Sequence, residues 1–212
     1  MGRIKRKTNP AFVIVADGET EIWYLQMMKQ NERQVRLTIK PELPKKKRIE
    51  DQCALVCELA QREYDKVFWI VDLDQITKEQ REATGGKKDP MRTFIECREK
   101  VLHGKKYAKR VRVIVNNPCL EFWFLLHYTH TDKSFGGYEE LAKALKKYMK
   151  DYNKSEGYFK QKNNDIYLKL KPRLKKAMEH SDRLGSFEPK DPSRAVSEMP
   201  QFFRTEELNG LF

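Results

Sequence analysis

The chain alternates between apolar runs of strand length and longer segments with apolar residues at helical spacing. The strand-like runs are Ala11 to Ala16, Gln34 to Ile39, Val67 to Val71 and Arg110 to Val115. The helical segments between them are Glu21 to Lys29, Arg48 to Tyr64 and Met91 to Leu102. Strands that alternate with helices, without an internal repeat, predict an α/β fold with a central, mostly parallel sheet of about four strands flanked by helices.

The pattern also predicts where individual segments lie. Val67 to Val71 is apolar without interruption, which is typical of a strand buried on both faces. Gln34 to Ile39 alternates between polar and apolar residues and is expected near an edge of the sheet. The polar segment from Ile76 to Pro90 is interpreted as a loop.

The character of the chain changes after Thr131, where basic amphipathic helices replace strands. We therefore expect a basic N-terminal tail over residues 1–9, an α/β domain over 10–130 and a C-terminal helical extension over 131–212. The loop from Lys150 to Gln161 mixes lysines with the aromatic residues Tyr152, Tyr158 and Phe159. Such a mixture suits contacts to a nucleic-acid backbone and its bases. Alternatively, the aromatic residues dock the extension on the core.

Two carboxylates, Asp72 and Asp74, follow the central apolar strand directly. In an extended segment, side chains two positions apart point to the same side, so these carboxylates would repel each other. Mg²⁺ binds sites built from one or two carboxylates and water, and open parallel sheets bind ligands beyond the carboxyl ends of their strands. We expect a Mg²⁺ site here; the alternative is a strand-ending turn, in which Asp is common.

The first strand runs into the segment Asp17-Gly18-Glu19-Thr20-Glu21. Gly18 permits a tight turn and Thr20 is a good helix cap, so Asp17 is expected at a strand end that faces the start of a helix. Glu19 and Glu21 are interpreted as residues of the first helical turn, where negative charge interacts favourably with the helix dipole.

A nearly all-apolar segment, Asn117 to Tyr128, follows the fourth strand. Asn117 as cap and Pro118 at the first helical position predict a helix start. Glu121 is the only carboxylate of this segment, and a buried carboxylate needs a cation, a hydrogen-bond donor or a proton. Glu121 is therefore a candidate for the same metal site, or for a buried ion pair with a Lys or Arg. The four cysteines show no metal-type spacing, and Cys119 stands alone.

The chain has 43 Lys and Arg residues against 31 Asp and Glu residues, a formal net charge of +12. This excess favours a polyanionic partner, nucleic acid first, although a basic surface can also serve solubility alone. The candidate binding residues are Lys45, Lys46, Lys47, Arg48, Lys87 and Lys88. No window is long and apolar enough to span a membrane, and the basic N-terminus lacks the apolar stretch of a secretory signal. A cytoplasmic protein without a membrane partner is expected.

Three motifs in this order resemble a known family. A strand followed by an acidic residue, Gly, x, Thr and an acidic residue, and later a strand that ends in Asp-x-Asp, is similar to the Toprim fold. The pattern Asn-Pro-x-x-Glu-x-Trp-x-x-x-His, here Asn117 to His127, narrows the resemblance to the RloB-like proteins. Asp191-Pro192-Ser193 resembles a late motif of that family. The resemblance covers about residues 9 to 200.

The resemblance implies a metal-dependent nuclease that hydrolyses phosphodiester bonds of DNA or RNA. By position, Asp17 would act as general acid or base or hold a metal, and Asp72 and Asp74 would bind Mg²⁺ or Mn²⁺. Glu121 would assist as a further catalytic residue. Toprim proteins generally have Glu at the position of Asp17, and Asp is one methylene shorter.

The family also implies a biological setting, namely an antiphage effector of a restriction or abortive-infection system with an AAA-type ATPase as partner. The alternative function is a non-catalytic nucleic-acid-binding or assembly subunit of such a complex, which the shorter side chain of Asp17 favours. Primase-like nucleotidyl transfer also fits the fold, but no recognisable nucleotide-binding motif accompanies it. A homo-oligomer is compatible with each of these functions.

Overall fold

The computed structural model describes residues 10–16, 18–40, 48–82 and 89–208. Its strands are β1 (Ala11–Val15), β2 (Arg36–Lys40), β3 (Lys66–Asp72), β4 (Val111–Asn117) and β5 (Val196–Ser197). Its helices are α1 (Glu19–Asn31), α2 (Ile49–Leu59), α3 (Leu73–Glu82), α4 (Pro90–His103), α5 (Glu121–Leu126), α6 (Tyr138–Leu145), α7 (Glu156–Phe159), α8 (Ile166–Leu170), α9 (Leu174–Leu184) and α10 (Pro200–Phe203), with short 3-10 helices η1 (Lys171–Arg173) and η2 (Glu206–Leu208). No helix within these ranges is long and apolar enough to cross a membrane.

The five strands form one sheet in the order β2-β1-β3-β4-β5. β1 pairs in parallel with β2 and β3, β3 pairs in parallel with β4, and the two-residue β5 pairs with β4 in the antiparallel direction. The predicted α/β fold with a mostly parallel sheet is confirmed, and it is consistent with a Toprim-like arrangement. β3 lies at the centre and β2 at one edge, where one face of the strand stays partly exposed and its sequence alternates accordingly.

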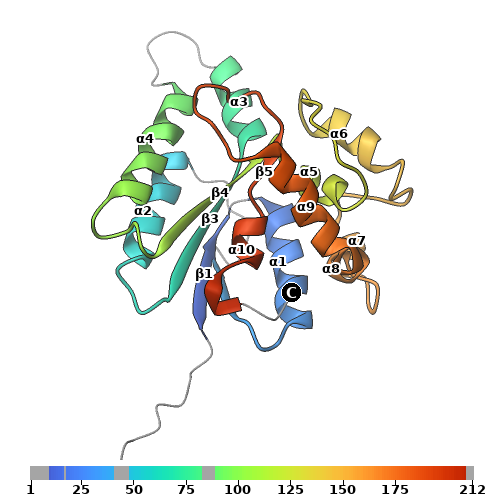
Figure 1. Ribbon diagram of the computed structural model, residues 1–212, viewed down its shortest axis with the longest axis horizontal. Coiled ribbons are helices and arrows are strands. Elements are labelled where there is room, and N and C mark those ends of the chain that lie inside the picture. The colour runs from blue at the N-terminus through green and yellow to red at the C-terminus, as the bar shows by residue number, and fades with distance from the viewer. Residues whose placement is uncertain (1–9, 17, 41–47, 83–88, 209–212) are drawn as a thin grey trace, which may run out of the picture.

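Successive residues of the central strand point to opposite faces of the sheet, and each face packs against its own set of helices. Phe68 and Ile70 join the core beneath α1 and the C-terminal helices, whereas Val67, Trp69 and Val71 join the core beneath α2, α3 and α4. Figure 1 shows α2 and α4 on one side of the sheet and α1, α9 and α10 on the other. Burial on both sides explains why the sequence of β3 is uniformly apolar.

The prediction of a loop after the central strand is wrong over its first part. α3 continues to Glu82, and its buried residues are Leu73 and Ile76. A helix that contacts the core at so few positions has a polar sequence, which is why it resembles a loop. Residues 83–88 lie outside the described ranges.

The predicted helix start at Asn117 and Pro118 is also wrong. Asn117 ends β4, the Asn117–Pro118 peptide bond is cis, and α5 begins at Glu121. The Asn117 amide donates hydrogen bonds to the carbonyl oxygens of Pro192 (2.9 Å) and Arg194 (2.7 Å). This side chain therefore joins the end of β4 to the segment that leads into β5, instead of capping a helix.

The C-terminal residues pack on the same core as the sheet. α8 contacts α1, and α9 contacts α5. The predicted loop at 150–161 contains α7. Tyr152 and Phe159 of this segment are buried, so these aromatic side chains dock the C-terminal part on the core.

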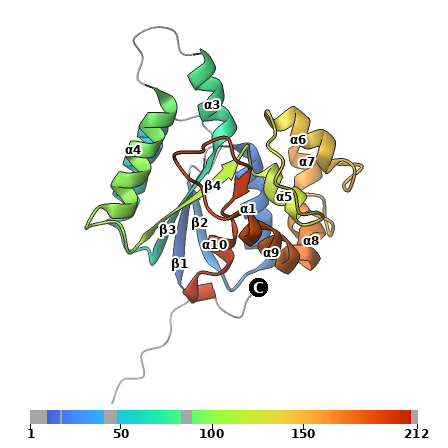
Figure 2. The ribbon, with the colours of Figure 1, turned by 45° about the horizontal axis from the view of Figure 1, so that its top comes forward.

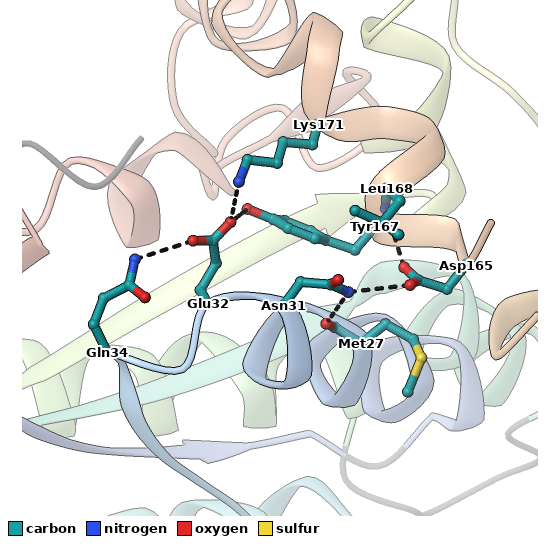
Figure 3. A network of polar contacts seen from close by, with 8 residues as sticks. All are labelled: Met27, Asn31, Glu32, Gln34, Asp165, Tyr167, Leu168 and Lys171. Carbon is teal, nitrogen blue, oxygen red and sulfur yellow. Dashed lines mark hydrogen bonds and ion pairs between the residues drawn. The ribbon is translucent and has the colours of Figure 1, made fainter. Parts of the chain in front are cut away.

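Glu32, directly after α1, is the centre of one contact between the α/β part of the chain and its C-terminal part (Figure 3). Its carboxylate accepts hydrogen bonds from Tyr167 Oη (2.8 Å), Lys171 Nζ (2.5 Å) and Gln34 Nε2 (3.1 Å). Burial alone would raise the pKa of Glu32, but the hydrogen bonds from Lys171 and Tyr167 outweigh burial and hold that pKa below its usual value. The network fastens α8 and η1 to α1.

The C-terminal end of the outer edge of β4, from Val115 to Asn117, is covered by β5 and by the residue after it. β5 pairs with Asn116 and Asn117, and the Glu198 N–H donates to the carbonyl oxygen of Val115 (2.9 Å). The Glu198 carboxylate in turn accepts hydrogen bonds from the N–H groups of Val115 (3.0 Å) and Phe187 (3.2 Å). A side chain thus completes the pairing of β4 where β5 ends.

Candidate metal centre

The connections of the sheet reverse direction between β1 and β3. α1 carries the chain from β1 to β2, whereas α3 and α4 carry it from β3 to β4 in the opposite direction along the sheet. Open parallel sheets bind ligands at the carboxyl ends of the strands that flank such a reversal. A pocket of about 380 Å³ lies here, with walls from Gly18 to Glu21 and from the end of β3. We call it the acidic pocket; Figure 2 shows α3, α5 and α6 around this end of the sheet.

Asp72, the last residue of β3, is held in the acidic pocket by donors from two sides. Asn116 Nδ2 donates to its Oδ1 (3.2 Å), and the Leu120 N–H donates to its Oδ2 (3.0 Å). The Asn116 amide is itself oriented by β5, because Ser197 Oγ donates to Asn116 Oδ1 (2.7 Å). A chain of hydrogen bonds from β5 through β4 therefore fixes the position of the Asp72 carboxylate.

Burial and neighbouring carboxylates raise the pKa values of Asp72 and Asp74. The pKa of Asp72 lies well above its usual value, first because the group is buried and then because Glu21 lies within hydrogen-bonding range, with Asp74 and Glu121 nearby. The pKa of Asp74 is raised to about 6, by burial first and by Glu121 second, while Lys154 opposes the rise. The pocket gathers more negative charge than Lys154 alone neutralises.

Glu21 belongs to this cluster, although its sequence position indicates only a residue of the first helical turn. It does lie in the first turn of α1, but it is 5% exposed and its carboxylate lies within hydrogen-bonding range of Asp72. A Cβ atom on Gly18 would overlap with Glu21 Oε2, so a larger residue at position 18 would displace this carboxylate. The signal in the sequence is Gly18, which here permits a close approach of a side chain as well as a turn.

Glu121 is fully buried, as its apolar neighbours in the sequence predict. One oxygen, Oε1, accepts hydrogen bonds from Tyr152 Oη (3.0 Å) and Thr20 Oγ1 (3.3 Å) and pairs with Lys154 Nζ (3.1 Å). The other oxygen, Oε2, has no nitrogen or oxygen donor within the described part of the chain. Glu121 therefore forms the ion pair with a lysine and also lies next to Asp72.

Three side chains of this region lie close enough together to hold a metal ion. Asp72, Cys119 and Glu121 each offer a ligand atom within 4.8 Å of the others, and opposite ligands of one Mg²⁺ are about 4.2 Å apart. Carboxylate oxygens suit Mg²⁺ and Mn²⁺. Burial and then the nearby carboxylates raise the pKa of the Cys119 thiol, which keeps it protonated. Cys119 lies in the cluster although its isolated position in the sequence gives no metal signal.

The structure brings three of the four predicted catalytic residues together, namely Asp72, Asp74 and Glu121. The sequence predicts that Asp72 and Asp74 point to the same side because both would lie in an extended strand. That reason is wrong, since Asp74 does not continue the strand. It lies in the first turn of α3, where its N–H donates to the Pro118 carbonyl (2.9 Å), and a strand-to-helix turn brings both carboxylates to one pocket.

The remaining predicted residues fall into two groups. Arg48 is exposed before α2, pairs with Asp51 (3.4 Å) and does not line the acidic pocket. The others lie outside the described residues, and they are Asp17, Lys45, Lys46, Lys47, Lys87 and Lys88.

Comparison with known proteins identifies the family of the chain. Residues 12–203 match the model of the RloB-like protein family. No curated protein and no solved structure shows a significant match. The matched range runs from β1 to α10 and contains every described residue of the acidic pocket. The chain therefore belongs to the RloB-like protein family.

Proposed function

We propose that this protein is a metal-dependent nuclease that hydrolyses phosphodiester bonds of DNA or RNA. The observation that carries the proposal is a cluster of carboxylates at the reversal of the sheet. Glu21, Asp72 and Asp74 line the acidic pocket, and the buried Glu121 offers an oxygen within 4.8 Å of Asp72. Within the described chain, Lys154 is the one cation that lines this pocket. A divalent ion would offset the like-charge repulsion that raises the pKa of Asp72.

Asp72 and Asp74 are the proposed ligands of Mg²⁺ or Mn²⁺, with Glu21 beside them. A bound ion would lower the pKa of a water molecule and stabilise negative charge on the leaving oxygen. Asp72 suits the role of ligand because one protein donor orients each of its oxygens. A carboxylate oxygen that accepts one hydrogen bond retains a second lone pair for an ion.

Lys154 is proposed to bind a phosphate oxygen of the substrate. Its Nζ lies 3.1 Å from Glu121 Oε1, and its side chain is 39% exposed. Burial alone would lower the pKa of Lys154, but the Glu121 carboxylate outweighs burial and raises that pKa above its usual value. The ammonium group therefore stays charged at neutral pH, where it favours a phosphate in the pocket.

Membership of the RloB-like family supports further parts of the proposal. Asp17 would act as general acid or base or as a further metal ligand. The protein would work in the cytoplasm as an effector of an antiphage, abortive-infection system, with an AAA-type ATPase as partner. The net charge of +12 supports nucleic acid as the substrate.

Metal binding and cleavage test the proposal together. Calorimetric titration with Mg²⁺ and Mn²⁺, and cleavage of single-stranded and duplex DNA and RNA, are measured for the wild type and Asp72→Asn. The control is Glu179→Gln, which removes an exposed carboxylate of α9. We expect metal binding and metal-dependent cleavage in the wild type and the control, and the loss of both in Asp72→Asn.

Two results would change the conclusion. Cleavage that survives in Asp72→Asn would contradict the proposed site. A wild type that binds neither ion would favour the alternative function, a non-catalytic nucleic-acid-binding or assembly subunit.

A further inference from the structure

A second pocket adjoins the acidic pocket and shares Asp74, Gln75 and Lys154 with it. We call it the side pocket. α3 forms one wall, and the segment from Ser134 to Tyr138 forms another. Its volume is about 620 Å³, within the range of pockets that hold a ligand of nucleotide size. Because the two pockets share side chains, a ligand in the side pocket lies directly beside the proposed metal centre.

The α3 wall of the side pocket carries two exposed cations, Lys78 and Arg81. Residues three positions apart lie on the same face of a helix, and this face borders the pocket. Lys154 adds a third positive charge, against the carboxylates of Asp74 and Glu139. Cations along the wall of a groove suit successive phosphates of a nucleic-acid strand.

The second wall carries two partly exposed aromatic side chains, Phe135 and Tyr138, which are separated by two glycines. Phe135 is supported from the core by Phe122, whose ring centroid lies 6.0 Å away. Aromatic rings that are held by a core and line a charged groove bind unpaired bases by stacking. The glycines add no side chain between the rings. A lysine ammonium lies over each ring, Lys133 over Phe135 (5.3 Å to the centroid) and Lys154 over Tyr138 (4.4 Å).

We propose that the side pocket binds an unpaired nucleotide of a single-stranded nucleic acid, with its base against Phe135 and Tyr138. The adjoining phosphates would lie along the face of α3 that carries Lys78 and Arg81. The inference rests on the proposed function, because it names the substrate of the adjoining metal centre. A base that is paired and stacked in a duplex cannot offer its face to these rings. The strand is therefore single where it leaves the metal centre.

Fluorescence anisotropy in EDTA, which prevents metal-dependent cleavage, tests the cationic wall. The probes are DNA and RNA strands of about 12 nucleotides, and the matching DNA duplex. The wild type is compared with the double variant Lys78→Ala/Arg81→Ala. The control is Lys175→Ala/Lys176→Ala, which removes the same charge from exposed positions of α9 that line neither pocket.

We expect the Lys78→Ala/Arg81→Ala variant to bind both single strands about 10-fold more weakly than the control does. The slope of log K against log salt should also become shallower by about 1.4, because each lost phosphate contact of a single strand contributes about 0.7.

Tyr138→Leu tests stacking, with Tyr148→Leu as its control. Tyr148 is 47% exposed and stacks on Tyr128 away from the side pocket. We expect Tyr138→Leu to weaken single-strand binding about 10-fold without a change in the salt slope, and Tyr148→Leu to bind as the wild type does.

The outcomes separate the side pocket from the metal centre. Single-strand binding that depends on Lys78, Arg81 and Tyr138, without metal-dependent cleavage by the wild type, would support the side pocket and contradict the nuclease. Unchanged binding and an unchanged KM in these variants, with wild-type cleavage intact, would overturn the side pocket alone. A duplex bound as tightly as single strands, or no binding to any probe, would also overturn it.

Discussion

Two sets of a glutamate, a tyrosine and a lysine occur in this protein, and their electrostatic surroundings are opposite. The sets are Glu32, Tyr167 and Lys171, and Glu121, Tyr152 and Lys154. In both, the glutamate comes from the part of the chain before residue 130, and the tyrosine and lysine come from the C-terminal part. Both sets therefore join the two parts by the same chemistry.

The difference lies in what surrounds each glutamate. Glu32 gains a further donor from Gln34, and its hydrogen bonds hold its pKa below the usual value in spite of burial. Glu121 has Asp72 beside it and an oxygen without a donor in the described residues, and the pKa values of Asp72 and Asp74 rise. In the first set, the partners of Glu32 stabilise its negative charge. In the second set, negative charge remains that a cation can offset. That contrast separates a structural network from a candidate binding site.

The largest expected effect is the response to metal. At about 100 times its Kd, Mg²⁺ or Mn²⁺ should stabilise the wild type by about 2.7 kcal/mol, which raises the Tm of a chain of this size by about 5–10 °C. Asp72→Asn should lose this shift, and Glu32→Gln should keep it, because only the first variant changes the acidic pocket. Thermal unfolding with and without metal measures both. If metal raised the Tm of Asp72→Asn as much as that of the wild type, the acidic pocket would not be the metal site, and the two sets would not differ in this respect.

The same substitution in the two sets should have unequal effects without metal. Glu32→Gln should lower the free energy of unfolding by about 2 kcal/mol, because hydrogen bonds to charged groups contribute about 1.5–3 kcal/mol. Glu121→Gln should stay within about 1 kcal/mol of the wild type, since relief of repulsion with Asp72 offsets the lost pairing with Lys154. Urea unfolding in EDTA gives both values. Equal losses would show that the two glutamates have equivalent surroundings.

Removal of the hydrogen bond from β5 to Asn116 should lower the metal affinity less than removal of the Asp72 carboxylate does. Ser197→Ala removes the donor that orients the Asn116 amide towards Asp72, so Mn²⁺ affinity should fall about 10-fold, or about 1.4 kcal/mol. Ser181→Ala is the control, because its buried hydroxyl donates to the Ser197 carbonyl and not to Asn116. Calorimetry measures both affinities. Equal losses in the two variants would assign the effect to packing around β5.

The smallest expected effect is on the pH dependence of stability without metal. Because the pKa of Asp74 is raised from 3.8 to about 6, its unfavourable contribution at neutral pH is relieved as pH falls through about 6 towards 3.8. Because the pKa of Glu32 is lowered, its favourable contribution is complete above the ordinary value of 4.5 and is lost as pH falls through the lowered value. The Tm should rise slightly in the first range and fall in the second. Asp74→Asn should reduce the rise and leave the fall unchanged, because Asp72, whose pKa is also raised, contributes to the rise as well. A rise as large as that of the wild type would contradict the contribution of Asp74.

The sheet was predictable from the sequence because burial leaves a periodic signature. β3 is uniformly apolar because both of its faces are covered, and β2 alternates because one face is partly exposed. α3 was not predictable in the same way, since it contacts the core mainly through Leu73 and Ile76 and reads as a polar loop. Periodicity identifies an element only where enough of its residues are buried.

The candidate site was predictable where a carboxylate follows a buried strand, as Asp72 does, or stands alone in an apolar segment, as Glu121 does. Asp72 could be placed because ligands gather at the carboxyl ends of parallel strands. Lys154 and Ser197 could not, because contacts between distant residues place them, whereas Gly18 is a local signal for Glu21. Thr20 and Glu121 are 101 residues apart, and Tyr152 reaches Glu121 across 31 residues. Local pattern carries no information about such pairs.

The cover that Glu198 provides for β4 has a consequence for synthesis of the chain. Val115 and Glu198 are 83 residues apart, and at about 5–20 residues per second the ribosome needs about 4–17 s to add that interval. For this time the apolar strand β4 lacks its partner at one edge, where a neighbouring chain can pair with it. Val196 to Glu198 therefore cover this strand edge late in synthesis, and a chain truncated before Val196 would leave the edge open to pairing with another chain.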